Sequence, residues 1–94
     1  MDNIHDKKEI LVIKRDNSEE VLETQKFTRI AKATGLSDEE ASRIADIIRD
    51  RVLVIALKNA HKIKSTEIRD IFIDELSKTN QYAANLYKWY ETTK

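Results

Sequence analysis

Three basic side chains in the first third of the chain could bind a phosphorylated ligand. Lys14 and Arg15 are adjacent within the stretch VIKRDNS at 12–18, and Lys26 follows soon after. A triphosphate carries several negative charges, and converging ammonium and guanidinium groups supply both charge and geometric selectivity. Val12 and Lys14 point to the same face of an extended strand, because side chains alternate along a strand. The pattern indicates that Val12 can contact the base of a nucleotide while Lys14 reaches its phosphates.

Two apolar residues that follow, Leu22 and Phe27, are predicted to complete the slot for the base. A simpler explanation exists for each of these side chains. Charges at the end of an edge strand, such as Lys14 and Arg15, protect it from aggregation, and from pattern alone this explanation is favoured. Lys26 fits a solvated helix position, and the apolar side chains fit ordinary packing of a hairpin on a helix. Both explanations stay open at this point.

No arrangement of residues in the sequence is typical of catalysis. The two histidines, His5 and His61, have no carboxylate or nucleophile arranged around them in the sequence. The chain has no P-loop, no glycine-rich dinucleotide turn and no HExxH motif, and its one glycine is Gly35. The absence of cysteine excludes a thiol nucleophile, a disulfide framework and a zinc ribbon built on thiolates. We therefore do not expect an enzyme.

Composition and charge narrow the classes of partner. A chain of 94 residues fits one domain. The 17 basic and 17 acidic side chains cancel, which removes the broad cationic field of nonspecific nucleic-acid binders, so direct binding to DNA or RNA is not expected. No apolar run approaches the about 20 residues of a spanning helix, and the start MDNIHDKKEI does not resemble a signal peptide. We expect a cytoplasmic protein, neither secreted nor inserted in a membrane.

The hydrophobic pattern changes at Thr24, from the period of a strand to that of a helix. Before this point the sequence predicts a β-hairpin over residues 9–22, with Asn17 in the left-handed conformation that a tight turn demands. Residues 1–8 are predicted to be a flexible tail, and residues 9–94 a single domain. Because two short strands are marginal alone, the hairpin is expected to lie on the helices as a loose lid.

Helix start and stop signals divide the rest of the chain into four helices. Gly35 stands where a first helix would stop in a left-handed cap. Ser37 and Glu40 form a capping box at the start of the second helix, and Ser65 is predicted to cap the third. The predicted helices cover approximately residues 24–34, 38–61, 66–78 and 81–92.

The predicted second helix is the best candidate for the centre of the bundle. Ile47, Val54 and Leu57 are predicted to widen its buried face. The predicted fold class is therefore mainly α, of the α+β type, with an N-terminal β-hairpin lid packed on a four-helix bundle. The main apolar stripe of the helix consists of Ala41, Ile44, Ala45, Ile48, Val52 and Ala56.

Three stretches of the chain together resemble the ATP-cone domain family. VIKRDNS at 12–18 is similar to the VxKRDGS opening of these domains, and Lys26 falls where they have a second lysine. IKSTEIRDIFIDEL at 63–76 and QYAANLYKWY at 81–90 are similar to the start of their third helix and to their final helix. The KRD signature is short, but its combination with a hairpin and four helices in the right order is specific. The resemblance covers nearly the whole chain.

The resemblance implies an allosteric module that binds ATP or dATP, with or without Mg²⁺. Such domains stand most often at the start of ribonucleotide reductases, and they also follow a zinc ribbon in the repressors of reductase genes. The resemblance places Glu20 and Ser65 near the base or sugar. Glu23, where relatives have Asp or Asn, would cap the first helix or hold a hydrated magnesium ion. The implied nucleotide-binding residues are Val12, Lys14, Arg15, Glu20, Leu22, Lys26, Phe27 and Ser65.

The chain departs from the family pattern in two places. Asn17 replaces the usual glycine after KRD, a change that the turn accepts. In the final helix, Asn85, Tyr90 and Thr92 stand where relatives often carry arginines that face the phosphates. This second departure bears on the affinity for nucleotide and on the choice of nucleotide.

Three functions follow from these observations. The first is a stand-alone ATP or dATP sensor that acts on a separate protein of nucleotide metabolism or its regulation, or on its own oligomer. The alternative is a degenerate ATP-cone that no longer binds nucleotide and serves as a helical protein interaction module. The third is an accessory protein of transcription, which the neutral charge and the missing zinc ribbon disfavour.

Overall fold

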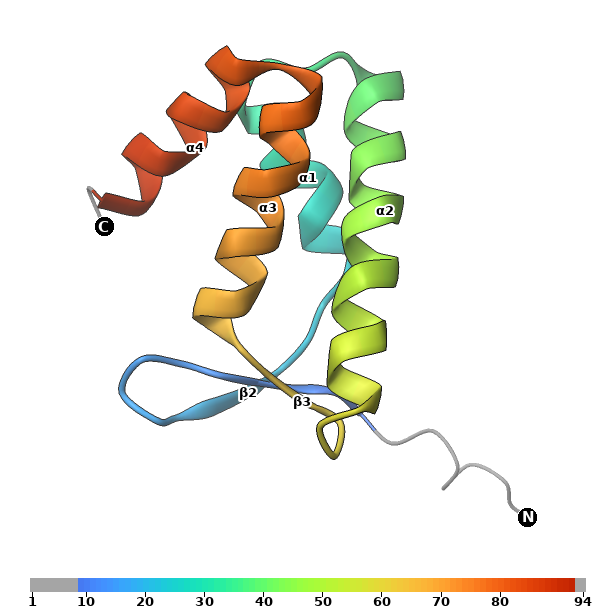
Figure 1. The fold of residues 1–94 in the computed structure, drawn as a ribbon, viewed down its shortest axis with the longest axis vertical. Coiled ribbons are helices and arrows are strands. Elements are labelled where there is room, and N and C mark those ends of the chain that lie inside the picture. The colour runs from blue at the N-terminus through green and yellow to red at the C-terminus, as the bar shows by residue number, and fades with distance from the viewer. Residues whose placement is uncertain (1–8, 93–94) are drawn as a thin grey trace.

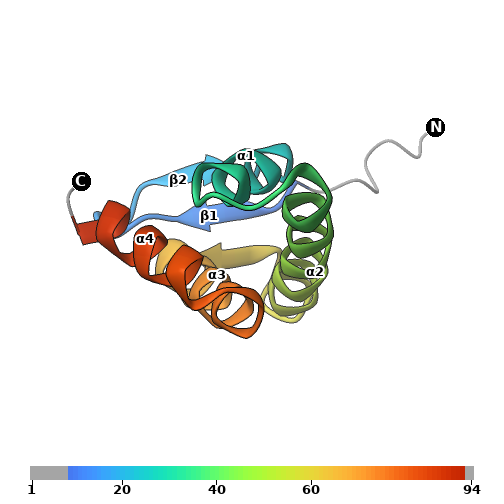
Figure 2. The same cartoon turned by 90° about the horizontal axis from the view of Figure 1, so that it is seen from above.

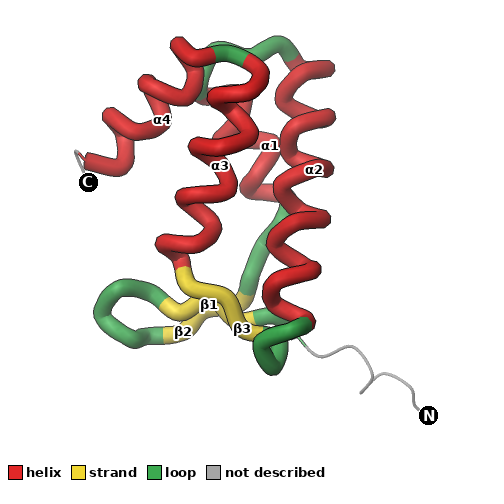
Figure 3. The backbone as a smooth tube through the Cα atoms, in the orientation of Figure 1, coloured by secondary structure: helices red, strands yellow, loops and turns green. Residues whose placement is uncertain are grey.

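The computed structural model describes residues 9–92, and it is mainly helical with a small three-stranded sheet at one end (Figure 1). Figure 3 shows the three strands gathered at this end, beside the turn of the hairpin. This is the predicted fold class. The predicted tail, residues 1–8, lies outside the described residues. The elements in chain order are β1 (Leu11–Ile13), β2 (Glu19–Val21), α1 (Gln25–Ala33), α2 (Asp38–Leu57), β3 (Lys62–Lys64), α3 (Ser65–Thr79) and α4 (Gln81–Thr92).

The hairpin lies where the sequence predicts it, with shorter strands. β1 and β2 pair antiparallel, and Val12 is opposite Glu20. The amide of Lys14 donates to the carbonyl of Ser18 at 2.8 Å, which closes the turn. Asn17 has a φ of 70°, the left-handed conformation that asparagine tolerates better than most residues. The tight turn therefore forms without the glycine that the family usually has.

A third strand, β3, was not predicted. The sequence predicts a helix that continues to residue 61, but α2 ends at Leu57 and the chain turns through Ala60 and His61, both at positive φ. β3 then pairs in parallel with β1, and Ile63 lies opposite Val12 in the register. β1 is thus the central strand, in the order β2, β1, β3. The prediction was wrong because a three-residue strand with a partner distant in sequence leaves almost no local pattern.

Aromatic rings from three helices meet in the core. Phe72 of α3 is fully buried, and its ring packs edge-on against Phe27 of α1 with centroids 5.5 Å apart. On its other side Phe72 stacks on Tyr87 of α4, with centroids 5.1 Å apart and planes 16° apart. Such pairs stabilise beyond the area they bury, by about 0.5–1.5 kcal/mol each. The rings fix the relative positions of α1, α3 and α4.

One face of α2 is buried, and it is narrower than the sequence predicts. The main stripe from Ala41 to Ala56 is buried as predicted. Ile47, Val54 and Leu57 are instead 40%, 52% and 60% exposed. Seen from above, α2 stands at the edge of the bundle, so its neighbours cover one side only (Figure 2). Neither α2 nor any other helix within residues 9–92 is long and apolar enough to cross a membrane.

The helix caps agree with the sequence at α2 but not at α3. The amide of Glu40 donates to Ser37 Oγ at 3.2 Å, and the Ser37 amide donates to Glu40 Oε1 at 3.3 Å, the predicted capping box. At α3 the capping position is Lys64, whose amide donates to Glu67 Oε1 at 3.0 Å. Ser65 is the first residue of the helix and not its cap, because the extended backbone of β3 continues to Lys64.

Candidate functional site

The turn of the hairpin presents two cations beside a pair of internal hydrogen bonds. Asp16 Oδ1 accepts hydrogen bonds from the amide of Ser18 at 3.0 Å and from its hydroxyl at 2.6 Å. The hydroxyl bond is the main reason why the pKa of Asp16 lies below its usual value. Lys14 and Arg15 stand immediately before this closed turn, with exposed side chains. The hairpin is therefore ordered in a form that offers both basic groups to a ligand.

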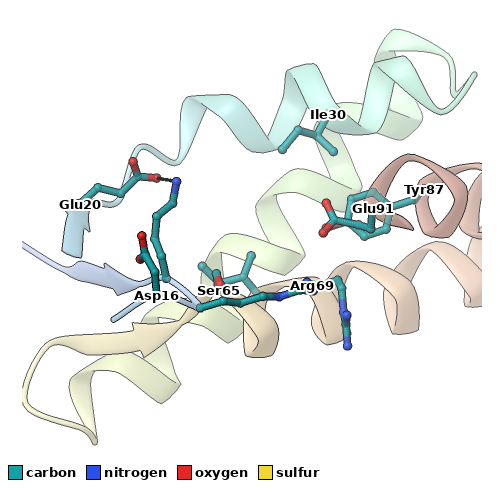
Figure 4. A pocket seen from close by; sticks show the side chains of 10 residues that line it. Asp16, Glu20, Ile30, Ser65, Arg69, Tyr87 and Glu91 are labelled. Carbon is teal, nitrogen blue, oxygen red and sulfur yellow. Dashed lines mark ion pairs between the residues drawn. The ribbon is translucent and has the colours of Figure 1, made fainter. Parts of the chain in front are cut away.

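Lys14 already has a partner across the hairpin. Its Nζ atom lies 3.6 Å from Oε1 of Glu20, and Figure 4 shows the pair at one end of a pocket. Both side chains are about half exposed, so water screens the attraction and the pair contributes little to stability. A ligand phosphate can therefore displace Glu20 from Lys14 at small cost.

The largest pocket lies between the hairpin and three helices. Its volume of about 540 Å³ is in the range of small-molecule sites, about 300–1,000 Å³. Residues of α1, α3 and α4 complete its wall, as Figure 4 shows for the labelled side chains. The lining residues are Lys14, Arg15, Asp16, Glu20, Ile30, Ser65, Ile68, Arg69, Tyr87 and Glu91.

Two smaller pockets adjoin the large one and share lining residues with it. An apolar pocket of about 120 Å³ shares Glu20, Ile30 and Ile68, and it adds the predicted Val12, Leu22, Lys26 and Phe27. Another of about 190 Å³ shares Lys14, Arg15 and Ser65. Each of the eight residues predicted from the sequence therefore lines at least one of these three neighbouring pockets: Val12, Lys14, Arg15, Glu20, Leu22, Lys26, Phe27 and Ser65.

The three predicted cations do not all face the same space. Lys14 and Arg15 line the large pocket, whereas Lys26 lines the apolar one, where its Nζ atom is 3.1 Å from Oε1 of Glu23. Glu23 was predicted to cap the first helix or to hold magnesium. The capping position of α1 is Thr24, without a side-chain hydrogen bond, and Glu23 pairs with Lys26.

Arg69 supplies the third cation of the large pocket, and the sequence did not single it out. Its Nε atom is buried and has no hydrogen-bond partner among residues 9–92. Its Nη2 donates to Oδ1 of the exposed Asp70 at 3.3 Å. An anion in the pocket would satisfy the free Nε–H, and a guanidinium suits phosphate oxygens. Arg69 follows Ser65 by one helical turn, and this spacing could have indicated it.

Tyr87 forms part of the apolar wall, although the aromatic residues of the final helix were left out of the predicted site. It is 6% exposed, and its ring stacks on Phe72. Burial raises the pKa of its hydroxyl, and the nearby Glu91 adds to the shift, so the group stays protonated at neutral pH. Tyr87 and Glu91 lie one turn apart on α4 and side by side in Figure 4. A helical spacing alone could not show which neighbours they meet.

The other residues of the large pocket that the sequence did not predict are Asp16, Ile30 and Ile68. The two isoleucines are half-buried and line both the large pocket and the apolar one. In the part of the chain that the structure describes, no group of three or more His, Asp or Glu side chains is arranged to hold a metal ion.

The comparison with protein families agrees with this arrangement of hairpin and helices. The family model of the ATP cone domain matches residues 10–90, from the start of the hairpin into α4. None of the curated proteins compared with the chain matches it. ATP-cone domains are in general nucleotide-binding regulatory domains and not catalytic ones. The match spans most of the chain, and the protein therefore belongs to the ATP-cone domain family.

Proposed function

We propose that this protein is an allosteric sensor that binds ATP or dATP in these neighbouring pockets. The observation that carries the proposal is the junction of two kinds of surface. A pocket with three cations shares Glu20, Ile30 and Ile68 with an apolar pocket that is also lined by Val12, Leu22 and Phe27. A nucleotide has the matching polarity, with a charged phosphate end and a flat, mainly apolar base.

The phosphates bind at the cationic end of the large pocket. Lys14 and Arg15 approach from the hairpin, and Arg69 approaches from α3 with a free Nε–H. Ser65 stands at the N-terminus of α3, where unpaired amides and the helix dipole favour an anion. The base lies in the apolar pocket against Phe27.

Glu20 connects the two parts of the site because it lines both pockets. In the structure its carboxylate is 3.6 Å from the ammonium of Lys14. When a phosphate replaces it there, the carboxylate becomes free to accept a hydrogen bond from the base or the sugar. Phosphate binding and base binding then support each other through one side chain.

Binding of the nucleotide changes the arrangement of the elements that it contacts. The lining residues come from the hairpin, α1, α3 and α4, so a ligand that binds all of them favours the arrangement in which they are close together. A surface that differs between the two arrangements would be recognised by a separate protein of nucleotide metabolism or its regulation, or by a second copy of this chain.

One observation favours the alternative of a degenerate domain that serves as an interaction module. Three aliphatic side chains on the outer side of α2, Ile47, Val54 and Leu57, are exposed, and so are Tyr82 and Trp89 on α4. Exposed apolar groups of this size occur where proteins associate. They are compatible with the sensor as well, since a sensor also needs a partner.

Isothermal titration of ATP and dATP, with magnesium, distinguishes the two functions. We expect micromolar binding to the wild-type protein. The double variant Lys14→Ala, Arg69→Ala should bind at least about ten-fold more weakly, because it removes two charge-assisted contacts. Lys58→Ala is the matched control, since Lys58 is an exposed cation that lines none of the three pockets. No heat up to millimolar nucleotide would refute the sensor and leave the interaction module.

A further inference from the structure

The pocket of about 190 Å³ beside the hairpin turn, which we call the turn pocket, is separate from the apolar pocket. The large pocket shares three lining residues with each of these two pockets, whereas the turn pocket and the apolar pocket have none in common. A ligand with its base in the apolar pocket therefore has to extend past the large pocket to reach the turn pocket. The turn pocket is lined by Ile13, Lys14, Arg15, Asn17, Lys64, Ser65 and Thr66.

The parallel pairing of β1 and β3 brings the residues of the turn pocket together. Ile13 lies opposite Lys64 in the register, so both strands end at the same edge of the sheet. Lys14 and Arg15 follow β1 directly, and α3 begins at Ser65 directly after β3. Figure 4 shows Ser65 at this start of α3, near the hairpin. The edge where parallel strands end and a helix begins is a common place for a ligand.

The turn pocket is cationic, whereas the large pocket is neutral. Three basic and three acidic residues line the large pocket, so their formal charges cancel. The turn pocket is lined by Lys14, Arg15 and Lys64 and by no acidic residue. Within residues 9–92 neither Arg15 nor Lys64 forms an ion pair, and Lys14 has only its exposed contact with Glu20. Converging cations repel one another, and a bound anion would remove that repulsion.

The size and the uncharged donors of the turn pocket suit one phosphate group. Its volume is below the about 300–1,000 Å³ of sites that enclose a whole small molecule. Ser65 and Thr66, the first two residues of α3, add hydroxyl groups, and Asn17 adds a side-chain amide. A terminal phosphate carries a charge of about −1.5 to −2 at pH 7. It is the part of a nucleotide that gains most from three cations.

On the basis of the proposed nucleotide site, we propose that Lys64 binds the terminal phosphate of a nucleoside triphosphate in the turn pocket, so that the site prefers a triphosphate to a diphosphate. With the base in the apolar pocket, the phosphate chain passes Lys14 and Arg15, which line both the large pocket and the turn pocket. Lys64 lines the turn pocket alone among the three pockets of the site. Only the longer chain brings a phosphate to it.

Calorimetric titration of ATP and of ADP, both in excess magnesium, tests this role. We expect the wild-type protein to bind ATP about ten-fold more tightly than ADP. Lys64→Gln removes the charge of an exposed side chain and keeps the main-chain amide that donates to Glu67 at 3.0 Å. This variant should bind ATP about five- to ten-fold more weakly than the wild type, and ADP within about two-fold of it.

Lys62→Gln is the matched control, because Lys62 belongs to the same strand and lines none of the three pockets. Its Nζ atom lies 3.2 Å from Oε2 of Glu19. The control removes the same charge two residues away and should keep the preference for ATP. An unchanged preference in Lys64→Gln would overturn the role of Lys64, and so would equal binding of ATP and ADP by the wild type. Absence of heat in every titration would instead overturn the nucleotide site itself.

Discussion

Replacing Ile47 and Ile48 separately by alanine gives a direct test of how α2 packs. The two residues are neighbours in the middle of the same helix, so the change in helix propensity is the same for both. Ile48 is fully buried, whereas Ile47 is 40% exposed on the outer side. The difference between the two variants therefore measures burial alone.

The expected magnitudes differ by several fold. Ile48→Ala removes buried methyl and methylene groups and leaves a cavity, which costs about 2–5 kcal/mol of unfolding free energy. Ile47→Ala loses only partial contacts and gains a few tenths of a kcal/mol in helix propensity, so its cost stays below about 1 kcal/mol. In a domain of this size 1 kcal/mol corresponds to about 4–8 °C in Tm, so the two variants should melt about 10–20 °C apart.

Urea unfolding followed by circular dichroism gives both free energies on one scale. The measurement should be repeated at two protein concentrations, because an interface through the outer side of α2 would make the stability depend on concentration. Equal destabilisation by the two substitutions at both concentrations would show that α2 is buried on two sides and would refute this packing.

Two further predictions concern electrostatics and the turn. The pKa of Asp74 is lowered, first by the hydrogen bond from Arg51 and then by Lys78, so its contribution to stability is present above the ordinary pKa of 3.8 and is lost as pH falls through the lower folded value. The urea midpoint of the wild type should decrease as the pH is lowered, and Asp74→Asn should make this decrease smaller. An unchanged decrease would show that other carboxylates cause it. Asn17→Ala should lower the unfolding free energy by about 1 kcal/mol, because alanine tolerates the left-handed turn poorly, whereas Asn17→Gly should be near neutral in the same assay.

Local patterns predicted the features whose causes are local. The hairpin turn at Asn17, the capping box of Ser37 and the buried stripe of α2 each depend on residues within one or two turns of the chain. β3 could not be predicted in this way, because Ile63 is held by a strand far away in sequence. Ile47 was assigned to the core because an apolar side chain on a helix does not reveal how many sides of that helix have neighbours.

The place of the predicted site residues in the fold was predictable to a similar degree. The residues of the hairpin and of α1 stand in a contiguous motif, and they line two pockets that share lining residues. Arg69, Tyr87 and Glu91 were missed because their place in the wall depends on how α3 and α4 pack around Phe72. A pattern within one helix carries no information about which other element its side chains meet.

The central place of β1 has a consequence for the order of folding. The amide of Leu11 donates to the carbonyl of His61 at 2.9 Å, so the sheet joins the beginning of the chain to a segment beyond α2. Closing so long a loop has an entropic cost, which contacts between distant residues recover only late in folding. We therefore expect hydrogen exchange at Leu11 to require global unfolding, whereas the solvent-exposed turn near Asn17 exchanges through local opening. A partly folded chain, in which the helices have formed but β1 has not yet paired with β3, would therefore lack the pocket.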